Sequence, residues 1–211
     1  MKTLNDYFEK IFCINLDKRF DRWKESRNEF EKHNLQVERI TAIDGKIQNV
    51  NTNLKPGELG CILSHLKVIK KAKKDNLKNV LILEDDVEFD KNLNQLFFEY
   101  ESQLPKWDML YFGGNHSFNN VYMPKHNEPI KVSENVYKIR QIYTTHCYAI
   151  DNSLYDMIID NVSQMRSPLD VIYSSIHSKC ETYLLRPHLA WQRNDYSDIM
   201  EKSVDYSFLK K

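Results

Sequence analysis

The hydrophobic and polar positions of the chain follow two periods that alternate along its first half. Residues 8–16 (FEKIFCINL) and 36–42 (QVERITA) have the pattern of strands, and residues 80–83 (VLIL) form an apolar run typical of a buried parallel strand. Apolar residues at helical spacing predict one helix that ends near Asn34 and another over 56–75. This order of elements is typical of a layered α/β fold.

The second half continues the alternation less regularly. We predict helices near 93–103 and 153–162 and from 167 onward, and strands at 107–112, 136–142, 144–150 and 180–185. The expected fold is therefore α/β, with a mostly parallel central sheet flanked by helices. A mobile loop is expected near 116–134, and the tail after Trp191 is polar and aromatic without a predicted element.

Composition limits the classes of function. A length of 211 residues predicts a single domain over 1–211. With 30 basic and 30 acidic residues the net charge is zero, so no nucleic-acid footprint is present. The lysines of 67–74 alternate with apolar residues at helical spacing, which indicates a solvated helix face.

The cysteines and the N-terminus indicate a soluble protein of a reducing compartment. The four cysteines are widely separated and lack zinc-binding spacing, and Cys13 and Cys61 lie in apolar runs that predict buried thiols. Residues 1–10 are polar and contain no secretory signal. The apolar runs are too short to span a bilayer, so no membrane span is expected.

The most informative feature is the acidic triplet that follows residues 80–83. If the strand continues, Glu84 and Asp86 share one side and Asp85 faces the other. Three like charges beside a buried segment are costly unless a cation offsets them. A divalent metal on a phosphate-bearing ligand would do so. Capping of a following helix is the alternative, and the triplet by itself favours neither.

Other polar residues also follow predicted strands. They are residues 17–22, Asp44 and residues 113–115. In an open α/β sheet, ligands bind outside the carboxyl ends of the strands. We therefore expect these residues and the acidic triplet to meet at one crevice, which favours the metal interpretation.

Four motifs with this order and spacing resemble glycosyltransferase family 25. They are INLDKRFDR (14–22), TAIDG (41–45), GELGCILSH (57–65) and LILEDDVEF (81–89). That family includes bacterial lipopolysaccharide β-galactosyltransferases and collagen hydroxylysine galactosyltransferases. Later segments fit as well, and the resemblance covers about residues 10 to 200: WDMLYFG (107–113), TTHCYAI (144–150), SPLD (167–170), and Pro187 with Ser197 and Asp198.

The resemblance implies a GT-A-type (Rossmann-like) fold, a nucleotide-sugar donor, inversion at the transferred sugar, and Mn²⁺ or another divalent cation. Asp86 is the expected metal ligand, with Glu84 as a second or water-mediated ligand. His188 is a further candidate ligand, and a packed histidine is its equal alternative. Asp85 is expected to meet the ribose or a backbone donor.

An inverting transfer requires a base that takes the proton of the attacking hydroxyl. Asp170 is the expected base because the family carries a proline-x-aspartate here, and a helix-start aspartate is its structural alternative. Glu58 is the second choice, with helix capping as its alternative.

Further residues are assigned to the donor. The structural alternatives are helix packing for His65, a tight turn for the glycines and surface ion pairs for Arg22, which could also meet phosphate or base. The assigned residues are Arg19, Asp44, His65, Gly113, Gly114 and Asn115.

The predicted function is a metal-dependent inverting glycosyltransferase that moves a hexose, with galactose favoured, from a UDP-sugar to a hydroxyl of a glycan or a hydroxylysine. The alternative is an inactive nucleotide-sugar- or carbohydrate-binding protein with the same fold. A nucleotidyltransferase is disfavoured because residues 17–22 contain no glycine for a phosphate loop. The sugar, the acceptor and the oligomeric state are not fixed by the sequence.

Two departures from the family pattern are informative. The acidic motif begins with Glu84 instead of aspartate, so a symmetrical two-aspartate clamp is not expected. The sequence also lacks the secretory signal and second domain of the animal collagen-modifying enzymes. This favours a bacterial or viral enzyme in the bacterial cytosol or the virus-infected host cytoplasm. It would act in glycan biosynthesis, such as that of lipopolysaccharide, or on a protein.

Overall fold

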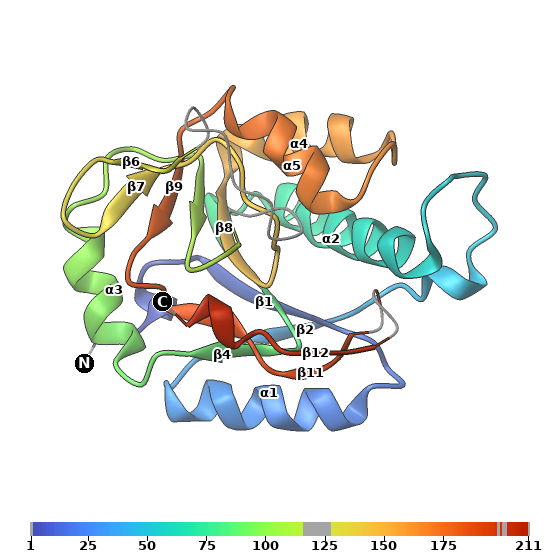
Figure 1. Ribbon diagram of the computed structural model, residues 1–211, viewed down its shortest axis with the longest axis horizontal. Coiled ribbons are helices and arrows are strands. Elements are labelled where there is room, and N and C mark those ends of the chain that lie inside the picture. The colour runs from blue at the N-terminus through green and yellow to red at the C-terminus, as the bar shows by residue number, and fades with distance from the viewer. Residues whose placement is uncertain (1, 116–127, 198, 200–201, 211) are drawn as a thin grey trace.

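A central sheet of eight strands organises the protein, shown in Figure 1 as a computed structural model that describes residues 2–115, 128–197, 199 and 202–210. The spatial order is β2-β1-β3-β8-β5-β9-β7-β6. Strands β8 and β7 run opposite to the other six, which confirms the predicted mostly parallel sheet. The bounds are β1 (Lys10–Asn15), β2 (Glu38–Thr41), β3 (Asn79–Glu84), β5 (Met109–Tyr111), β6 (Ile130–Lys131), β7 (Val136–Lys138), β8 (Cys147–Asp151) and β9 (Thr182–Leu185).

Helices cover both faces of the sheet, as predicted (Figure 1). On one face lie α2, α4 and α5, and on the other lie α1 and α3. Helix α2 begins with a proline in its first turn, where the missing N–H costs no hydrogen bond. The bounds are α1 (Phe20–Lys32), α2 (Pro56–Lys74), α3 (Leu93–Glu101), α4 (Tyr155–Val162) and α5 (Leu169–His177).

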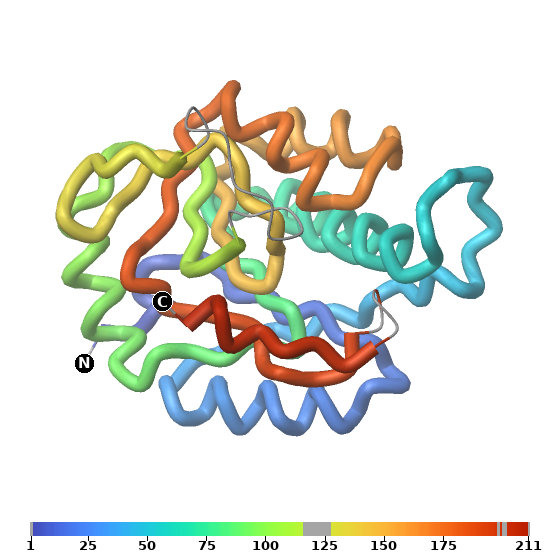
Figure 2. The backbone as a smooth tube through the Cα atoms, in the orientation of Figure 1, coloured from blue at the N-terminus to red at the C-terminus, as the bar shows by residue number. Residues whose placement is uncertain are grey.

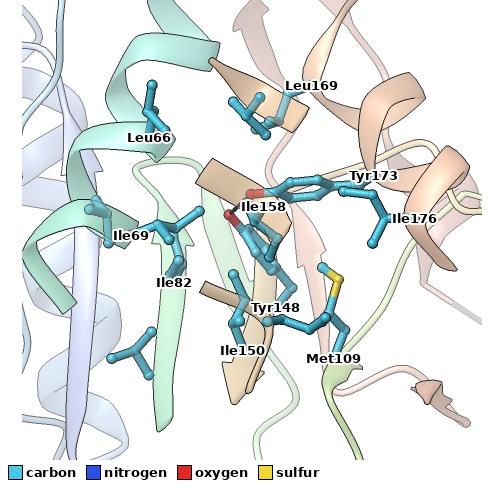
Figure 3. Packing of buried hydrophobic residues seen from close by; sticks show 14 of the residues in the cluster. Leu66, Ile69, Ile82, Met109, Tyr148, Ile150, Ile158, Leu169, Tyr173 and Ile176 are labelled. Atoms are coloured by element: carbon cyan, nitrogen blue, oxygen red, sulfur yellow. Dashed lines mark hydrogen bonds between the residues drawn. The ribbon is translucent and has the colours of Figure 1, made fainter. Parts of the chain in front are cut away.

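The alternation of side chains along the strands divides the core in two. In β1, Phe12 and Ile14 pack toward α2, whereas Ile11 and Cys13 pack toward α1 and α3. Figure 3 shows the first cluster, in which Tyr148 of β8 meets helices α4 and α5. Both faces are apolar, so the inner strands β1, β3, β5, β8 and β9 are largely buried on both sides, as predicted for residues 80–83.

Short elements complete the fold. Strand β4 (Val87–Phe89) pairs with β10 (Ala190–Gln192), and β11 (Asp195–Ser197) pairs with β12 (Lys202–Val204). The 3-10 helices are η1 (Leu4–Asp6), η2 (Gly45–Ile47), η4 (Asn152–Leu154) and η5 (Ser207–Leu209).

The structure corrects the predicted elements in three places. Strand β7 ends at Lys138 and β8 begins at Cys147, so much of the two predicted strands is a connecting segment. The tail after Trp191 contains β11, β12 and η5, and Figure 2 traces it in red back to the middle of the molecule. The predicted loop near 116–134 contains β6, and its residues 116–127 lie outside the described residues. Among the described helices, we find none long and apolar enough to cross a membrane.

Candidate active site

A cavity of about 540 Å³ lies beyond the carboxyl ends of β1 and β3. This is where ligands bind in open α/β sheets. Its opposite wall comes from the starts of α2 and α5 and from the segment before β8. The C-terminal tail contributes a further set of lining residues, namely Gln192, Ser197, Ile199, Val204, Tyr206 and Phe208.

The predicted crevice brings many of the expected residues together. Seven of the residues that the sequence singles out line this one cavity: Asp44, His65, Glu84, Asp85, Asp86, Asn115 and Asp170. They come from segments far apart in the sequence, and the parallel strands that end at one edge of the sheet explain why they meet.

Asp85 is held by short hydrogen bonds on both of its carboxylate oxygens. Asn15 donates to Oδ2 at 2.7 Å, and Arg22 Nη1 donates to Oδ1 at 2.8 Å. Burial raises the pKa of Asp85, although Arg22 and Asn15 oppose that effect. Both carboxylate oxygens of Asp85 therefore have hydrogen-bond donors, which fix the position of the side chain.

Asp86 is buried in the same cluster with much weaker contacts. Its Oδ2 lies 3.4 Å from Arg22 Nη1 and 3.5 Å from Gln192 Nε2. Within the described residues, the buried Oδ1 accepts no hydrogen bond. Burial and the neighbouring charge of Glu84 raise the pKa of Asp86 to about 7. Asp86 thus has one oxygen without a hydrogen bond and a negative charge that Arg22 compensates only in part.

Strand β3 ends at Glu84, so the strand alternation expected for the triplet does not continue. Asp85 and Asp86 share the guanidinium of Arg22, and the predicted separation of their side chains is wrong. Glu84 instead faces helix α2: its Oε1 lies 3.4 Å from His65 Nε2 and accepts a hydrogen bond from Thr145 at 2.6 Å. Burial acts to raise the pKa of Glu84, but His65 and Thr145 lower it overall.

Asp170 lies on the opposite wall, in the first turn of α5. Its Oδ1 accepts a hydrogen bond from the backbone N–H of Val171 at 2.8 Å. Burial, with the charges of Glu84 and Glu58, raises the pKa of Asp170. A carboxylate with a raised pKa is a stronger base, as proton abstraction requires.

Asp44 and Asn115 lie at the edge of the cavity. Asp44 accepts hydrogen bonds from Lys18 Nζ at 2.5 Å and from the backbone of Lys46 at 3.0 Å. Lys18 is the main cause of its lowered pKa. The backbone carbonyl of Asn115 accepts from the N–H of Tyr143 at 2.8 Å, which holds this corner in place.

Two charged candidates lie outside the residues that line the cavity. The Arg19 guanidinium binds Asp21 at 3.0 Å and Asp195 at 3.4 Å. Glu58 accepts a hydrogen bond from the backbone N–H of Lys55 at 2.9 Å. This is the helix-capping role that the sequence analysis gave as the alternative to a catalytic one.

The remaining candidates pack against the protein itself. A Cβ on Gly113 would overlap the carbonyl oxygen of Ala190, and one on Gly114 would overlap Ile142. Both glycines therefore permit close chain packing. His188 is buried behind the cavity, and its Nδ1 donates to the carbonyl of Leu209 at 2.8 Å.

The sequence model of glycosyltransferase family 25, described as an LPS biosynthesis protein family, matches residues 8–206. The chain belongs to glycosyltransferase family 25. This confirms the predicted family, and with it the GT-A-type fold class whose mostly parallel sheet and flanking helices the structure shows.

Three curated relatives illustrate the range of the family. A glycosyltransferase 25 family member of Drosophila pseudoobscura pseudoobscura is 34% identical over 127 residues, covering 50% of this chain and 20% of the relative. Procollagen galactosyltransferase 1 of Danio rerio is 30% identical over 129 residues, covering 50% and 21%. Inactive glycosyltransferase 25 family member 3 of Homo sapiens is 29% identical over 129 residues, covering 50% and 22%. The chain spans about a fifth of the length of these relatives.

Similarity to solved structures is weaker. The crystal structure of A197 from STIV has a TM-score of 0.48 and 11% identity, covering 92% of each chain. A glycosyltransferase involved in glycosylation of the major capsid of PBCV-1 has a TM-score of 0.44 and 12% identity, covering 73% of this chain and 64% of that one. The family assignment therefore depends on the sequence match.

The sequence interpretation left the role of Arg22 open and gave several other residues of this family 25 site no role. Arg22, left open there as a surface ion pair, is buried among three aspartates, and the amphipathic pattern of α1 gave a weak signal for that position. Thr145 lies in the TTHCYAI motif, which could have identified it. Cys61 is partly exposed as a residue and lines the cavity, while burial raises the pKa of its thiol well above its usual value, as expected for a buried thiol. The tail residues had no signal beyond their aromatic content.

The side chains at the end of β3 fit a divalent cation. Asp86 Oδ1 is buried without a hydrogen bond, and burial together with Glu84 raises the pKa of its carboxyl, so the negative charge at this position is only partly compensated. Carboxylate oxygens are the ligands that Mn²⁺ and Mg²⁺ prefer. Asp86 would hold such an ion. Glu84 also lines the cavity and would be the second ligand, whereas His188 is not among the lining residues.

Proposed function

We propose that the protein is a metal-dependent inverting glycosyltransferase that transfers a hexose from a UDP-sugar to a hydroxyl group. The observation that carries this proposal is the buried, uncompensated Asp86 Oδ1 at the wall of a family 25 cavity that Asp170 also lines. A cation-binding carboxylate and a candidate base across one cavity are the two parts that such a transfer needs.

The donor diphosphate would lie against the end of β3. Asp86, with Glu84 beside it, would hold the divalent cation, which when bound neutralises the charge that develops on the departing UDP. Arg22 holds Asp85 and Asp86 in position, because its Nη1 lies 2.8 Å from Asp85 Oδ1 and 3.4 Å from Asp86 Oδ2. Asp44, paired with Lys18 at 2.5 Å, would meet the ribose or the base.

Asp170 would act as the base from the opposite wall. The acceptor oxygen attacks the anomeric carbon, the bond from that carbon to the UDP oxygen breaks, and the hydroxyl proton passes to an Asp170 carboxylate oxygen. A single displacement of this kind inverts the anomeric centre. The raised pKa of Asp170 supports the assignment because it strengthens the base.

The relatives suggest where to begin with substrates. Procollagen galactosyltransferases among them make UDP-galactose the first donor to test, and a procollagen chain one acceptor. The family description also suggests a lipopolysaccharide-type glycan acceptor. The side chains around the cavity mouth, which include the tail, are the ones that would select the acceptor.

A UDP-release assay tests the proposal. UDP-galactose, UDP-glucose and related UDP-sugars are incubated with the protein, with and without Mn²⁺ and with candidate acceptors. We expect Mn²⁺-dependent release of UDP from one preferred donor, by hydrolysis where no acceptor is present. Transfer at equal rate with a chelator present would contradict the metal assignment.

An inactive binding protein is the second candidate, because one relative is named as an inactive family member. That function predicts Mn²⁺-dependent binding of UDP-sugars without release of UDP on any acceptor. Calorimetry and the release assay on the same preparation separate the two functions.

A further inference from the structure

Three potential metal ligands of different chemistry meet on the helix side of the cavity. Cys61 and His65 lie four residues apart on α2, so they project from one face of the helix, and Glu84 approaches from the end of β3. The Cys61 thiol, a His65 ring nitrogen and a Glu84 oxygen lie within 4.8 Å of one another. All three residues line the cavity, so an ion has an entry path.

The distance between the His65 and Glu84 ligand atoms matches that of two ligands in a tetrahedral site. His65 Nε2 and Glu84 Oε1 are 3.4 Å apart. Two ligands that each bind Zn²⁺ at about 2.1 Å in tetrahedral geometry are separated by about 3.4 Å. The two ligand atoms therefore need little movement to share an ion.

Outer hydrogen bonds already orient two of the ligands. His65 Nδ1 lies 2.7 Å from the hydroxyl of Tyr148, which lies 3.1 Å from that of Tyr173. Figure 3 shows these two tyrosines facing each other in the core. If His65 Nδ1–H donates to the Tyr148 hydroxyl, Nε2 carries no proton, and its lone pair, which would bind the ion, points toward Glu84. On the other side, Thr145 donates to Glu84. Such partners are typical of metal-binding histidines and carboxylates.

We propose that Cys61, His65 and Glu84 form a binding site for a thiophilic divalent ion such as Zn²⁺, separate from the hard-cation position at Asp86. Binding converts the Cys61 thiol to a thiolate, with the proton released to solvent, and forms one bond each to sulfur, nitrogen and oxygen. The fourth coordination position faces the cavity and is open to water or a ligand. Soft and hard ions are thus divided between the two sides of Glu84 by ligand type.

Cobalt spectroscopy tests the site independently of any activity. Co²⁺ added to the wild-type protein should give the near-ultraviolet charge-transfer absorption of a thiolate–cobalt bond, at one equivalent per chain. Cys61→Ser should abolish this band and weaken Zn²⁺ binding at least about 10-fold. Cys180→Ser is the matched control, because Cys180 is also partly exposed but bonds to Ile176 and Thr182 away from the cavity.

The same titration separates this site from the proposed donor site. Asp86→Ala should keep the thiolate–cobalt band even where it loses Mn²⁺-dependent UDP binding. A wild-type protein without the band, or a band that survives in Cys61→Ser, overturns the proposal whatever the outcome of the UDP-release assay.

Thiol alkylation gives a second measurement on the unmodified sequence. Zn²⁺ should slow alkylation of Cys61 by iodoacetamide, followed by mass spectrometry, and leave the rate at Cys180 unchanged. Equal rates at Cys61 with and without Zn²⁺ would contradict the site even if a serine variant failed to fold.

Discussion

The two walls of the cavity solve the problem of buried charge in different ways. On the first wall, Asp85 and Asp195 each meet the Arg22 guanidinium within 3.0 Å, and Asn15 completes Asp85. The second wall comprises Asp170 at the start of α5 and the side chain of Glu84, which turns from the end of β3 toward His65 of α2. These two carboxylates receive their short hydrogen bonds from neutral groups, a threonine hydroxyl and a backbone N–H.

This difference indicates a division of roles. The first wall is an ion-pair framework whose one unbalanced member is Asp86, which suits the binding of a cation and a diphosphate. Among the contacts found in the described residues, the carboxylates of the second wall meet no arginine or lysine, and Glu84 has His65 as its nearest basic group, at 3.4 Å. Asp170 can therefore gain or lose a proton without breaking an ion pair to an arginine or lysine. Substitutions on each wall should therefore affect different measurements.

The largest effect is expected at Asp170 on the second wall. Asp170→Asn keeps the size of the side chain but removes the base, so transfer should fall about 10²- to 10⁴-fold. Binding of the UDP-sugar with Mn²⁺, measured by calorimetry, should stay within about 3-fold because the first wall is unchanged.

Glu58→Gln is the matched control for Asp170. Glu58 bonds to the Lys55 backbone at the start of α2, and glutamine can accept the same hydrogen bond. Its transfer rate should remain close to that of the wild type. If this variant loses as much transfer as Asp170→Asn, the base has been assigned to the wrong residue.

The next effect should be on stability, at Arg22 of the first wall. Arg22→Met leaves Asp85, Asp86 and Asp195 without their shared cation and should lower the free energy of unfolding by about 3–5 kcal/mol. Arg19→Met is the control: its strongest pair is with the exposed Asp21, so about 1 kcal/mol or less is expected. Denaturant titrations that gave equal losses for both variants would show that the first wall is not a buried ion-pair framework.

The sequence predicted the first wall better than the second. Strand ends in a parallel sheet meet at one edge, so periodicity alone brought Asp44, the acidic triplet and residues 113–115 to one region. Asp170 was placed by its family motif and a helix-start signal, and it does line the cavity.

The features that the sequence did not predict depend on tertiary contacts. Strand alternation failed after Glu84 because β3 ends there and a turn begins. The buried position of Arg22 depends on the tail, since Asp195 and the Tyr196 carbonyl contact it from more than 170 residues away. Gly113 serves packing against Ala190, which a local pattern of glycines does not reveal.

A smaller effect, with opposite signs for function and stability, is expected at Asp86. Asp86→Asn should weaken Mn²⁺-dependent UDP binding at least about 100-fold, since it removes a direct ligand. The folded-state pKa of about 7 lies above the ordinary aspartate value, so the charged carboxylate destabilises the fold at high pH. The metal-free variant should thus be more stable than the wild type at pH 8, with a smaller gain as the pH falls below 7. Asp85→Asn, which loses its short bond from Arg22, should instead destabilise the protein.

The smallest effect is expected at His177, and it tests whether titratable groups buried next to the second wall are also held in their neutral form. His177 of α5 is buried, with Nε2 3.0 Å from the Tyr111 hydroxyl, and burial lowers its pKa to about 3. Because the unfolded chain binds a proton near pH 6.5 and the folded one does not, its contribution to stability is complete above that pH. It is lost as the pH falls toward 3. Asp86 titrates in the opposite sense, so the wild-type profile alone is not diagnostic.

Comparison with His177→Gln isolates this group, because Asp86 contributes equally to both proteins and cancels. Glutamine can still accept from Tyr111 but does not titrate. The stability of the wild type relative to the variant should decrease by about 2 kcal/mol between pH 7.5 and pH 5 in denaturant titrations. A difference between the two proteins that stays constant over this range would mean that His177 binds protons equally in the folded and unfolded states, so that burial does not lower its pKa. The groups without a cationic partner would then be limited to the cavity surface, and the buried side of α5 would not share this property.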